Sequence, residues 1–100
     1  MEPQGDIALI GLAVMGRNLI LNMNDHGFTV VAHNRTAERI DEFLEGEAKN
    51  TNIIGAHSIP EMVLKLKKPR RIMMLIKAGK PVDDFIDQLI PHLEVGDIII

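Results

Sequence analysis

Short apolar runs, which contain a polar residue only at Thr29, alternate along this chain with longer stretches in which apolar residues recur every three or four positions. The apolar runs lie at 7–10, 28–32, 53–54, 72–76 and 98–100. A run without polar alternation is typical of a strand that is covered on both faces, as in a parallel sheet. The stretches with helical spacing fall between these runs, so the pattern predicts strands and helices in strict alternation.

Residues with special backbone preferences mark the ends of the predicted helices. Gly27 is suited to end the first helix, and Asn34 or Thr36 to cap the second. Ser58 is followed three positions later by a glutamate, which is the spacing of a capping box. Pro91 removes a backbone donor and is expected to kink or end the last helix. The predicted helices are one from 14 to about 25, one that follows the cap at 34 or 36 and ends within 45–52, one over 59–66, and one along an apolar stripe from 82 to 93.

This order predicts a Rossmann-like, doubly wound parallel sheet with helices on both faces, which is a three-layer α/β/α arrangement. The 100 residues are expected to form one domain, with the chain ending inside its fifth strand. Ligands of such sheets bind beyond the carboxyl ends of the strands, near the point where the strand order reverses. With the strand order 3-2-1-4-5, the loops at 11–16, 33–36 and 77–81 would border one crevice.

The first of these loops joins a buried strand to a helix. It is a variant of the dinucleotide-binding fingerprint in which Ala13 stands at the usual place of the middle glycine. Gly11 permits a tight turn, and Gly16 permits close packing of the helix on the strand. The backbone N–H groups between them, at a helix N-terminus, can hold a pyrophosphate. A turn whose glycines serve packing alone has the same pattern. The other loops must therefore distinguish a cofactor-binding turn from a purely structural one.

The second loop distinguishes between the two nicotinamide cofactors. In NAD-binding domains a carboxylate about 20 residues past the first glycine binds the ribose 2′-hydroxyl. Here the end of the second strand carries no carboxylate but Asn34, Arg35 and Thr36. A guanidinium can grip a 2′-phosphate with two parallel hydrogen bonds and stack on adenine. The loop therefore predicts NADP rather than NAD, the alternative being a solvated Arg35 beside a plain helix cap.

The remaining polar residues are weaker candidates for a functional site than the two loops. Lys77 ends the fourth strand at the same crevice, either beside the cofactor or as a surface lysine. The four histidines lack ligand spacing and there is no cysteine, so no metal site is expected. The basic residues of 65–71 have no aromatic neighbour and the net charge is −3, so neither nucleic acid nor a membrane is an expected partner. The acids of 83–87 begin a helix, where they favour its dipole.

The composition and the first residues indicate where in the cell the protein is expected. The 46% hydrophobic and 25% charged residues are ordinary for a globular domain. The first residues contain neither a signal peptide nor a spanning segment. The absence of cysteine fits a reducing compartment. The cytoplasm is therefore the expected location.

Several segments together resemble the start of the 6-phosphogluconate dehydrogenases. The resemblance covers nearly the whole chain, and Ala13 is the form that this family uses within its first loop. The segments that carry it are Ile10–Gly16, Asn18–Asn22, Asp25–Phe28, Asn34–Thr36, Lys65–Arg70, Lys77–Gly79 and Gly96–Ile100.

The resemblance implies an enzyme of the pentose phosphate pathway and of gluconate utilization. It implies the oxidative decarboxylation of 6-phosphogluconate to ribulose 5-phosphate, with reduction of NADP+. The first loop would hold the pyrophosphate, with Met15 near the nicotinamide, and 34–36 would bind the 2′-phosphate. The cofactor-binding residues implied in this way are Gly11, Leu12, Ala13, Val14, Met15, Gly16, Asn34, Arg35, Thr36, Ile76, Lys77 and Ala78.

The resemblance also implies what lies outside this chain. In this family, residues that hold the substrate would begin just past Ile100, and the catalytic lysine and glutamate lie much further on. The same is true of the large helical domain that forms the homodimer. The chain is therefore expected to bind NADP without turning over 6-phosphogluconate. A stand-alone NADP-sensing module and a relative of the NAD(P)-dependent 3-hydroxyacid dehydrogenases are the two alternatives.

Overall fold

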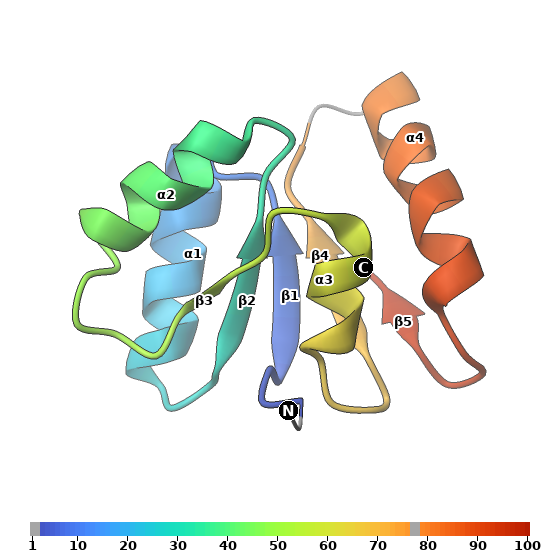
Figure 1. Cartoon of the computed structure of the whole chain (residues 1–100), viewed down its shortest axis with the longest axis horizontal. Coiled ribbons are helices and arrows are strands. Elements are labelled where there is room, and N and C mark those ends of the chain that lie inside the picture. Colours follow the sequence, from blue (N-terminus) through green and yellow to red (C-terminus); the bar gives the residue numbers. More distant parts are fainter. Residues whose placement is uncertain (1–2, 77–78) are drawn as a thin grey trace.

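A parallel five-stranded sheet forms the centre of the fold, with the strand order β3-β2-β1-β4-β5 (Figure 1). The structure is a computed structural model that describes residues 3–76 and 79–100. The predicted doubly wound fold and its strand order are confirmed. The strands are β1 (Ile7–Ile10), β2 (Val30–His33), β3 (Ile54–Gly55), β4 (Arg71–Met74) and β5 (Ile98–Ile99).

The helices connect these strands in the predicted alternation. A 3₁₀ turn, Ile90–His92, follows the last helix, which ends just before Pro91 as the missing donor requires. In the described ranges, no helix is long and apolar enough to cross a bilayer. The helices are α1 (Val14–Asp25), α2 (Ala37–Glu45), α3 (Ile59–Leu64) and α4 (Lys80–Leu89).

Helices cover both faces of the sheet, and each face has its own core (Figure 1). Successive residues of β1 point to opposite faces. Leu9 packs with residues of α1 and α2, including Ile20 and Phe43. Ile10 packs with residues of α3 and α4, including Phe85. This sandwich holds the carboxyl ends of the strands at one edge, where the predicted loops meet.

Several predicted element ends are wrong by one to a few residues; the fourth strand, for example, was expected at 72–76 and lies at Arg71–Met74. Two of these errors have a visible cause. Phe28 was expected in the second strand, but it is half exposed, and its N–H donates to the carbonyl of Met23 and so continues the end of α1. The third helix was expected to reach Leu66. It ends at Leu64 because Gly5 forms a parallel bridge with Leu66, with its N–H 2.8 Å from the carbonyl oxygen of Lys65.

Candidate functional site

The loops after β1 and β2 meet the end of β4 in a crevice of about 380 Å³. Two of the three loops predicted to border one crevice therefore do so. Leu75 and Ile76, at the end of β4 and just before the third loop, also line it, whereas Lys77 and Ala78 of that loop lie outside the described residues. The lining residues are Gly11, Leu12, Ala13, Asn34, Arg39, Leu75 and Ile76.

Gly11 and Gly16 bring three backbone segments into contact at this crevice. A Cβ on Gly11 would lie 2.3 Å from the carbonyl oxygen of Leu75, and the φ of Gly11 is +118°. A Cβ on Gly16 would lie 2.0 Å from the carbonyl oxygen of Gly11. Neither position has room for a side chain, so both glycines do the work that the fingerprint assigns to them.

The N-terminus of α1 presents unused backbone donors beside the crevice. The first helical hydrogen bond runs from the Arg17 N–H to the Ala13 carbonyl. Within the described ranges, the N–H groups of 13–16 donate to no acceptor, and Ala13 offers no capping side chain. The first turn of α1 carries no acid, and Val14 and Met15 are exposed. A cluster of free donors at the positive end of a helix dipole suits a phosphate group.

Asn34 ties the second loop to the first. Its Oδ1 accepts the Leu12 N–H at 3.0 Å, and its Nδ2 donates to the Thr36 carbonyl at 3.1 Å. Thr36 occupies the N-cap position of α2, but its side chain makes no capping hydrogen bond. Asn34 therefore fixes the shape of the crevice, and the predicted capping of α2 by a side chain of Asn34 or Thr36 is wrong.

Two arginines flank this loop. Arg35 is exposed and lines a second cleft, described below, whereas Arg39 lines the crevice itself beside Ala13. Sequence reasoning missed Arg39. Its signal was its place in the first turn of a helix that begins at the site, two residues after the start of α2.

The second cleft has a volume of about 580 Å³ and opens between the end of β2, the β3–α3 loop and α4. Positive and hydrogen-bonding groups stand on the strand side, and two carboxylates on the α4 side. The lining residues are His33, Arg35, His57, Ser58, Ile59, Pro60, Pro81, Asp84, Phe85, Asp87 and Gln88.

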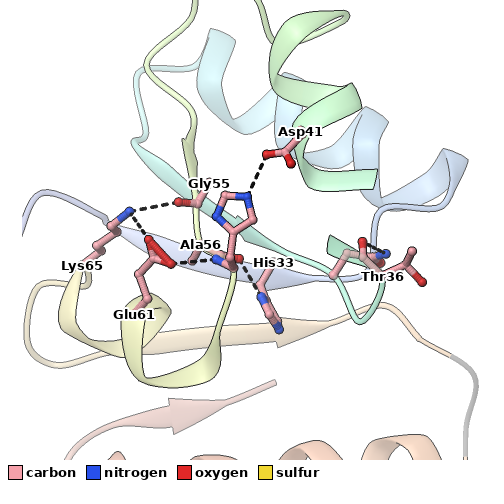
Figure 2. Close-up of polar contacts among 9 residues, drawn as sticks. His33, Thr36, Asp41, Gly55, Ala56, Glu61 and Lys65 are labelled. Carbon is pink, nitrogen blue, oxygen red and sulfur yellow. Dashed lines mark hydrogen bonds and ion pairs between the residues drawn. The ribbon is translucent and has the colours of Figure 1, made fainter. Parts of the chain in front are cut away.

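Hydrogen bonds hold the walls of this cleft in place (Figure 2). His57 Nε2 lies 2.7 Å from Asp41 Oδ1, which joins the β3–α3 loop to α2. Glu61 accepts the His57 N–H at 2.8 Å and pairs with Lys65 Nζ at 3.0 Å. The His57 N–H and then Lys65 hold the pKa of Glu61 below its usual value. The expected capping box is present in altered form, because Ser58 Oγ accepts the Glu61 N–H but Glu61 reaches back to His57.

The basic run of 65–71 is largely neutralised by acids. Three of its members pair with acids from distant segments, and Lys65 pairs with Glu61 of its own helix. No metal-binding group of acids and histidines occurs among the described residues. Lys67 and Lys68 are more than half exposed, as expected of a solvated surface, whereas the Arg70 side chain is only 11% exposed. The long-range pairs are Lys67–Asp6, Lys68–Glu94 and Arg70–Asp97.

Comparisons with known proteins match this geometry. Residues 6–100 match the family model described as the NAD binding domain of 6-phosphogluconate dehydrogenase. The chain belongs to this family. It is 72% identical over 97 residues to the decarboxylating 6-phosphogluconate dehydrogenase of Caenorhabditis elegans, covering 97% of this chain and 20% of that protein. The Haemophilus ducreyi enzyme is 67% identical over 100 residues, covering 100% and 21% respectively.

Comparison with solved structures gives the same family. Plasmodium falciparum 6-phosphogluconate dehydrogenase, solved in its apo form and with NADP+ or 6-phosphogluconate, aligns with a TM-score of 0.84 at 46% identity, over 94% of this chain and 20% of that one. An imine reductase of Aspergillus terreus aligns at 0.69 with 17% identity, over 97% and 31%, and so shares the fold alone. The chain thus spans about one-fifth of the 6-phosphogluconate dehydrogenases it matches.

Proposed function

We propose that this chain is the NADP-binding part of a 6-phosphogluconate dehydrogenase. The whole enzyme would convert 6-phosphogluconate to ribulose 5-phosphate and CO2 while reducing NADP+. The observation that carries the cofactor assignment is the end of β2. There the crevice and the adjoining cleft are lined by Arg39 and Arg35, and no carboxylate occupies the usual ribose-binding position.

The proposed pyrophosphate site is the loop from Gly11 to Gly16. Its support is the set of unused N–H groups at the start of α1, together with the closeness of backbone segments that only glycine allows. Val14 and Met15 are exposed in the first turn of α1, directly after Ala13, which lines the crevice, and the nicotinamide half is proposed to lie beside them. When bound, NADP+ supplies the hydride acceptor, and this chain's residues bind and orient it.

The proposed adenosine site is the cleft beside Arg35. A volume of about 580 Å³ accommodates an adenine ring and its ribose, and Arg35 can stack on the ring or grip the 2′-phosphate. Arg39, one turn along α2, supplies a second cation between that phosphate and the pyrophosphate. Thr36, with a hydroxyl that makes no capping bond, and Asn34 complete the proposed 2′-phosphate loop. Ile76 borders the crevice, and Lys77 and Ala78 are proposed cofactor contacts from the resemblance.

Further properties of the whole enzyme are proposals as well. We expect the residues that act on 6-phosphogluconate to belong to segments beyond this chain, because no pair of acid and base groups faces the described crevice. We likewise propose a homodimer formed by those segments, and a cytoplasmic location, with which the absence of cysteine agrees.

Calorimetric titration tests the cofactor assignment directly. We expect NADP+ to bind at least about tenfold more tightly than NAD+, since a hydrogen bond to a charged group contributes roughly 1.5–3 kcal/mol. The fragment 2′,5′-ADP should compete with NADP+, whereas 5′-AMP should compete much less. Equal affinities for NADP+ and NAD+ would contradict the proposal.

A second experiment tests whether the residues that act on 6-phosphogluconate lie outside this chain. The chain mixed with NADP+ and 6-phosphogluconate should produce no NADPH, as followed by absorbance. Steady production of NADPH would mean that the catalytic groups lie within these 100 residues.

A further inference from the structure

His33 ends β2 and forms part of the floor of the larger cleft, although its side chain has no role in the proposed function. The residue is only 5% exposed. Its Nδ1 lies 2.7 Å from the carbonyl oxygen of Ala56, at the end of the neighbouring β3. Because a carbonyl oxygen only accepts hydrogen bonds, Nδ1 must carry the proton of this bond.

The imidazole is neutral at pH 7. Burial lowers the pKa of His33, and the bond to Ala56 and the charge of Glu61 offset this only in part. With the single proton on Nδ1, Nε2 has a lone pair and no hydrogen. In the described part of the chain, Nε2 finds no hydrogen-bond donor.

The ring is held in one orientation, so the lone pair has a fixed direction. His33 stands edge-on to Phe85 of α4, with ring centroids 6.1 Å apart and an interplanar angle of 88°. Figure 2 shows one ring nitrogen of His33 turned to Ala56 and the other at the far side of the ring. Both His33 and Phe85 line the cleft. An acceptor without a protein partner thus belongs to a fixed ring that lines the proposed adenosine site.

We propose that Nε2 of His33 accepts a hydrogen bond from the 6-amino group of adenine and thereby selects adenine over hypoxanthine. The inference rests on the proposed function, which puts the adenosine in this cleft. Adenine offers an N–H donor at position 6, whereas hypoxanthine has a carbonyl oxygen there. That oxygen would face the Nε2 lone pair, and the bound base would shut water out, so that two acceptors would be left without a donor.

The other acceptors in the cleft are poorer candidates for this role. Asp84 of α4 already pairs with Lys80, at 3.1 Å. Asp87 and Gln88 are exposed, so water satisfies them whichever base is bound. Selectivity arises where losing a partner leaves a buried group unsatisfied, and of these groups only His33 is buried.

The test compares NADP+ with its deaminated analogue, nicotinamide hypoxanthine dinucleotide phosphate, by calorimetric titration of the 100-residue chain at pH 7.5. We expect NADP+ to bind about tenfold more tightly. In His33→Phe, which keeps an aromatic ring against Phe85 but has no acceptor, the ratio should fall close to one. Asp87→Asn is the matched control on the opposite wall and should keep the full ratio.

The outcomes separate this inference from the proposed function. Failure of NADP+ to bind the unmodified chain overturns the proposed function. Binding of NADP+ with equal affinity for the analogue overturns the role of His33 alone, and it does so without any variant. Retention of the ratio by His33→Phe, with circular dichroism showing a folded chain, also overturns it. A loss of the ratio in Asp87→Asn would assign the selection to α4 instead.

Discussion

At the scale of the residue, the site is defined as much by the side chains it lacks as by those it has. No carboxylate stands at the end of β2, and Arg35 and Arg39 line the two clefts in which we propose that the cofactor binds. In the described ranges, neither arginine pairs with an acid. An unpaired guanidinium keeps its full charge for an anionic ligand, so each should contribute to the choice of cofactor.

Arg35→Asp should reverse that choice. Loss of a charge-assisted hydrogen bond costs roughly 1.5–3 kcal/mol, which is about ten- to a hundredfold in NADP+ affinity. The new carboxylate also repels the 2′-phosphate and can bind a ribose hydroxyl, so NAD+ should bind better than NADP+. Arg71→Asp, with the same change of charge at the amino end of β4, is the control and should leave the ratio unchanged. The measurement is calorimetric titration with both cofactors.

Gly16→Ala should abolish cofactor binding. Its Cβ would lie 2.0 Å from the Gly11 carbonyl oxygen, so helix and loop must separate, at a cost of about 1–3 kcal/mol or more. Gly27→Ala is the matched control, because Gly27 has a φ of +93° but nothing within 4 Å of the added Cβ. It should lose about 1 kcal/mol of stability through backbone strain and keep its affinity for NADP+. Urea unfolding and titration measure the two effects separately.

At the scale of the element, the sequence predicts what depends on local pattern. The apolar runs and their turns predict the alternation of strands and helices, and Gly27, Ser58 and Pro91 lie at or next to helix ends as expected. What it misses is set by particular contacts. Phe28 donates back to Met23, five residues earlier, instead of extending β2. The helix ending at Leu64 is cut short by a bridge between Gly5 and Leu66, which are distant in the chain.

The same distinction applies to the site. Gly11 and Gly16 can be predicted because they stand at a fixed spacing between one strand and the next helix, although the atom nearest to a Cβ on Gly11 belongs to Leu75, which is distant in the chain. The bridging role of Asn34 is not, since it depends on the carboxyl ends of β1 and β2 lying side by side. His33 follows an apolar run and is sequestered only because β3 and α4 pack around it.

His33 joins three elements, and its protonation should therefore affect stability. Burial lowers its pKa in the folded chain below the ordinary 6.5. Above that pH the ring is neutral in both states and its effect is constant. As pH falls below about 6.5, the unfolded chain takes up the proton first, so the free energy of unfolding falls, by up to about 1.4 kcal/mol per pH unit. Urea unfolding between pH 7.5 and 5 measures this slope.

His33→Phe is the comparison, since it removes the titrating group. Its stability should depend less on pH in that interval, and an equal slope in both chains would rule out His33 as the cause. Carboxylates with shifted pKa values contribute little to the pH dependence of stability between pH 7.5 and 5. The pKa values of Asp6, Glu61 and Asp97 are lowered in the folded chain, so their stabilising effect is lost only as pH falls below their ordinary values of 3.8 to 4.5.

At the scale of the whole molecule, the two edges of the sheet perpendicular to its strands have different roles. The carboxyl edge carries both clefts. The amino edge is closed by ion pairs, of which Arg70–Asp97 is the most buried, with side chains 11% and 1% exposed. Burial raises the pKa of Asp97, but hydrogen bonds from the Glu94 and Arg70 N–H groups outweigh it and keep the pKa low. This pair anchors the turn before β5 and so positions the outermost strand.

That outermost strand should make the chain associate at high concentration. β5 pairs with β4 on one side, and within the described residues its other side pairs with no strand. Ile98 and Ile100 are 50% and 59% exposed beside it, so apolar surface and unpaired backbone groups coincide. We expect the average mass by light scattering to rise with concentration.

The double variant Ile98→Lys, Ile100→Lys should remain monomeric, because edge lysines oppose pairing. Val95→Lys, at a fully exposed turn, should associate like the parent chain. A mass that is independent of concentration in the parent chain would show that the chain does not associate through this strand edge.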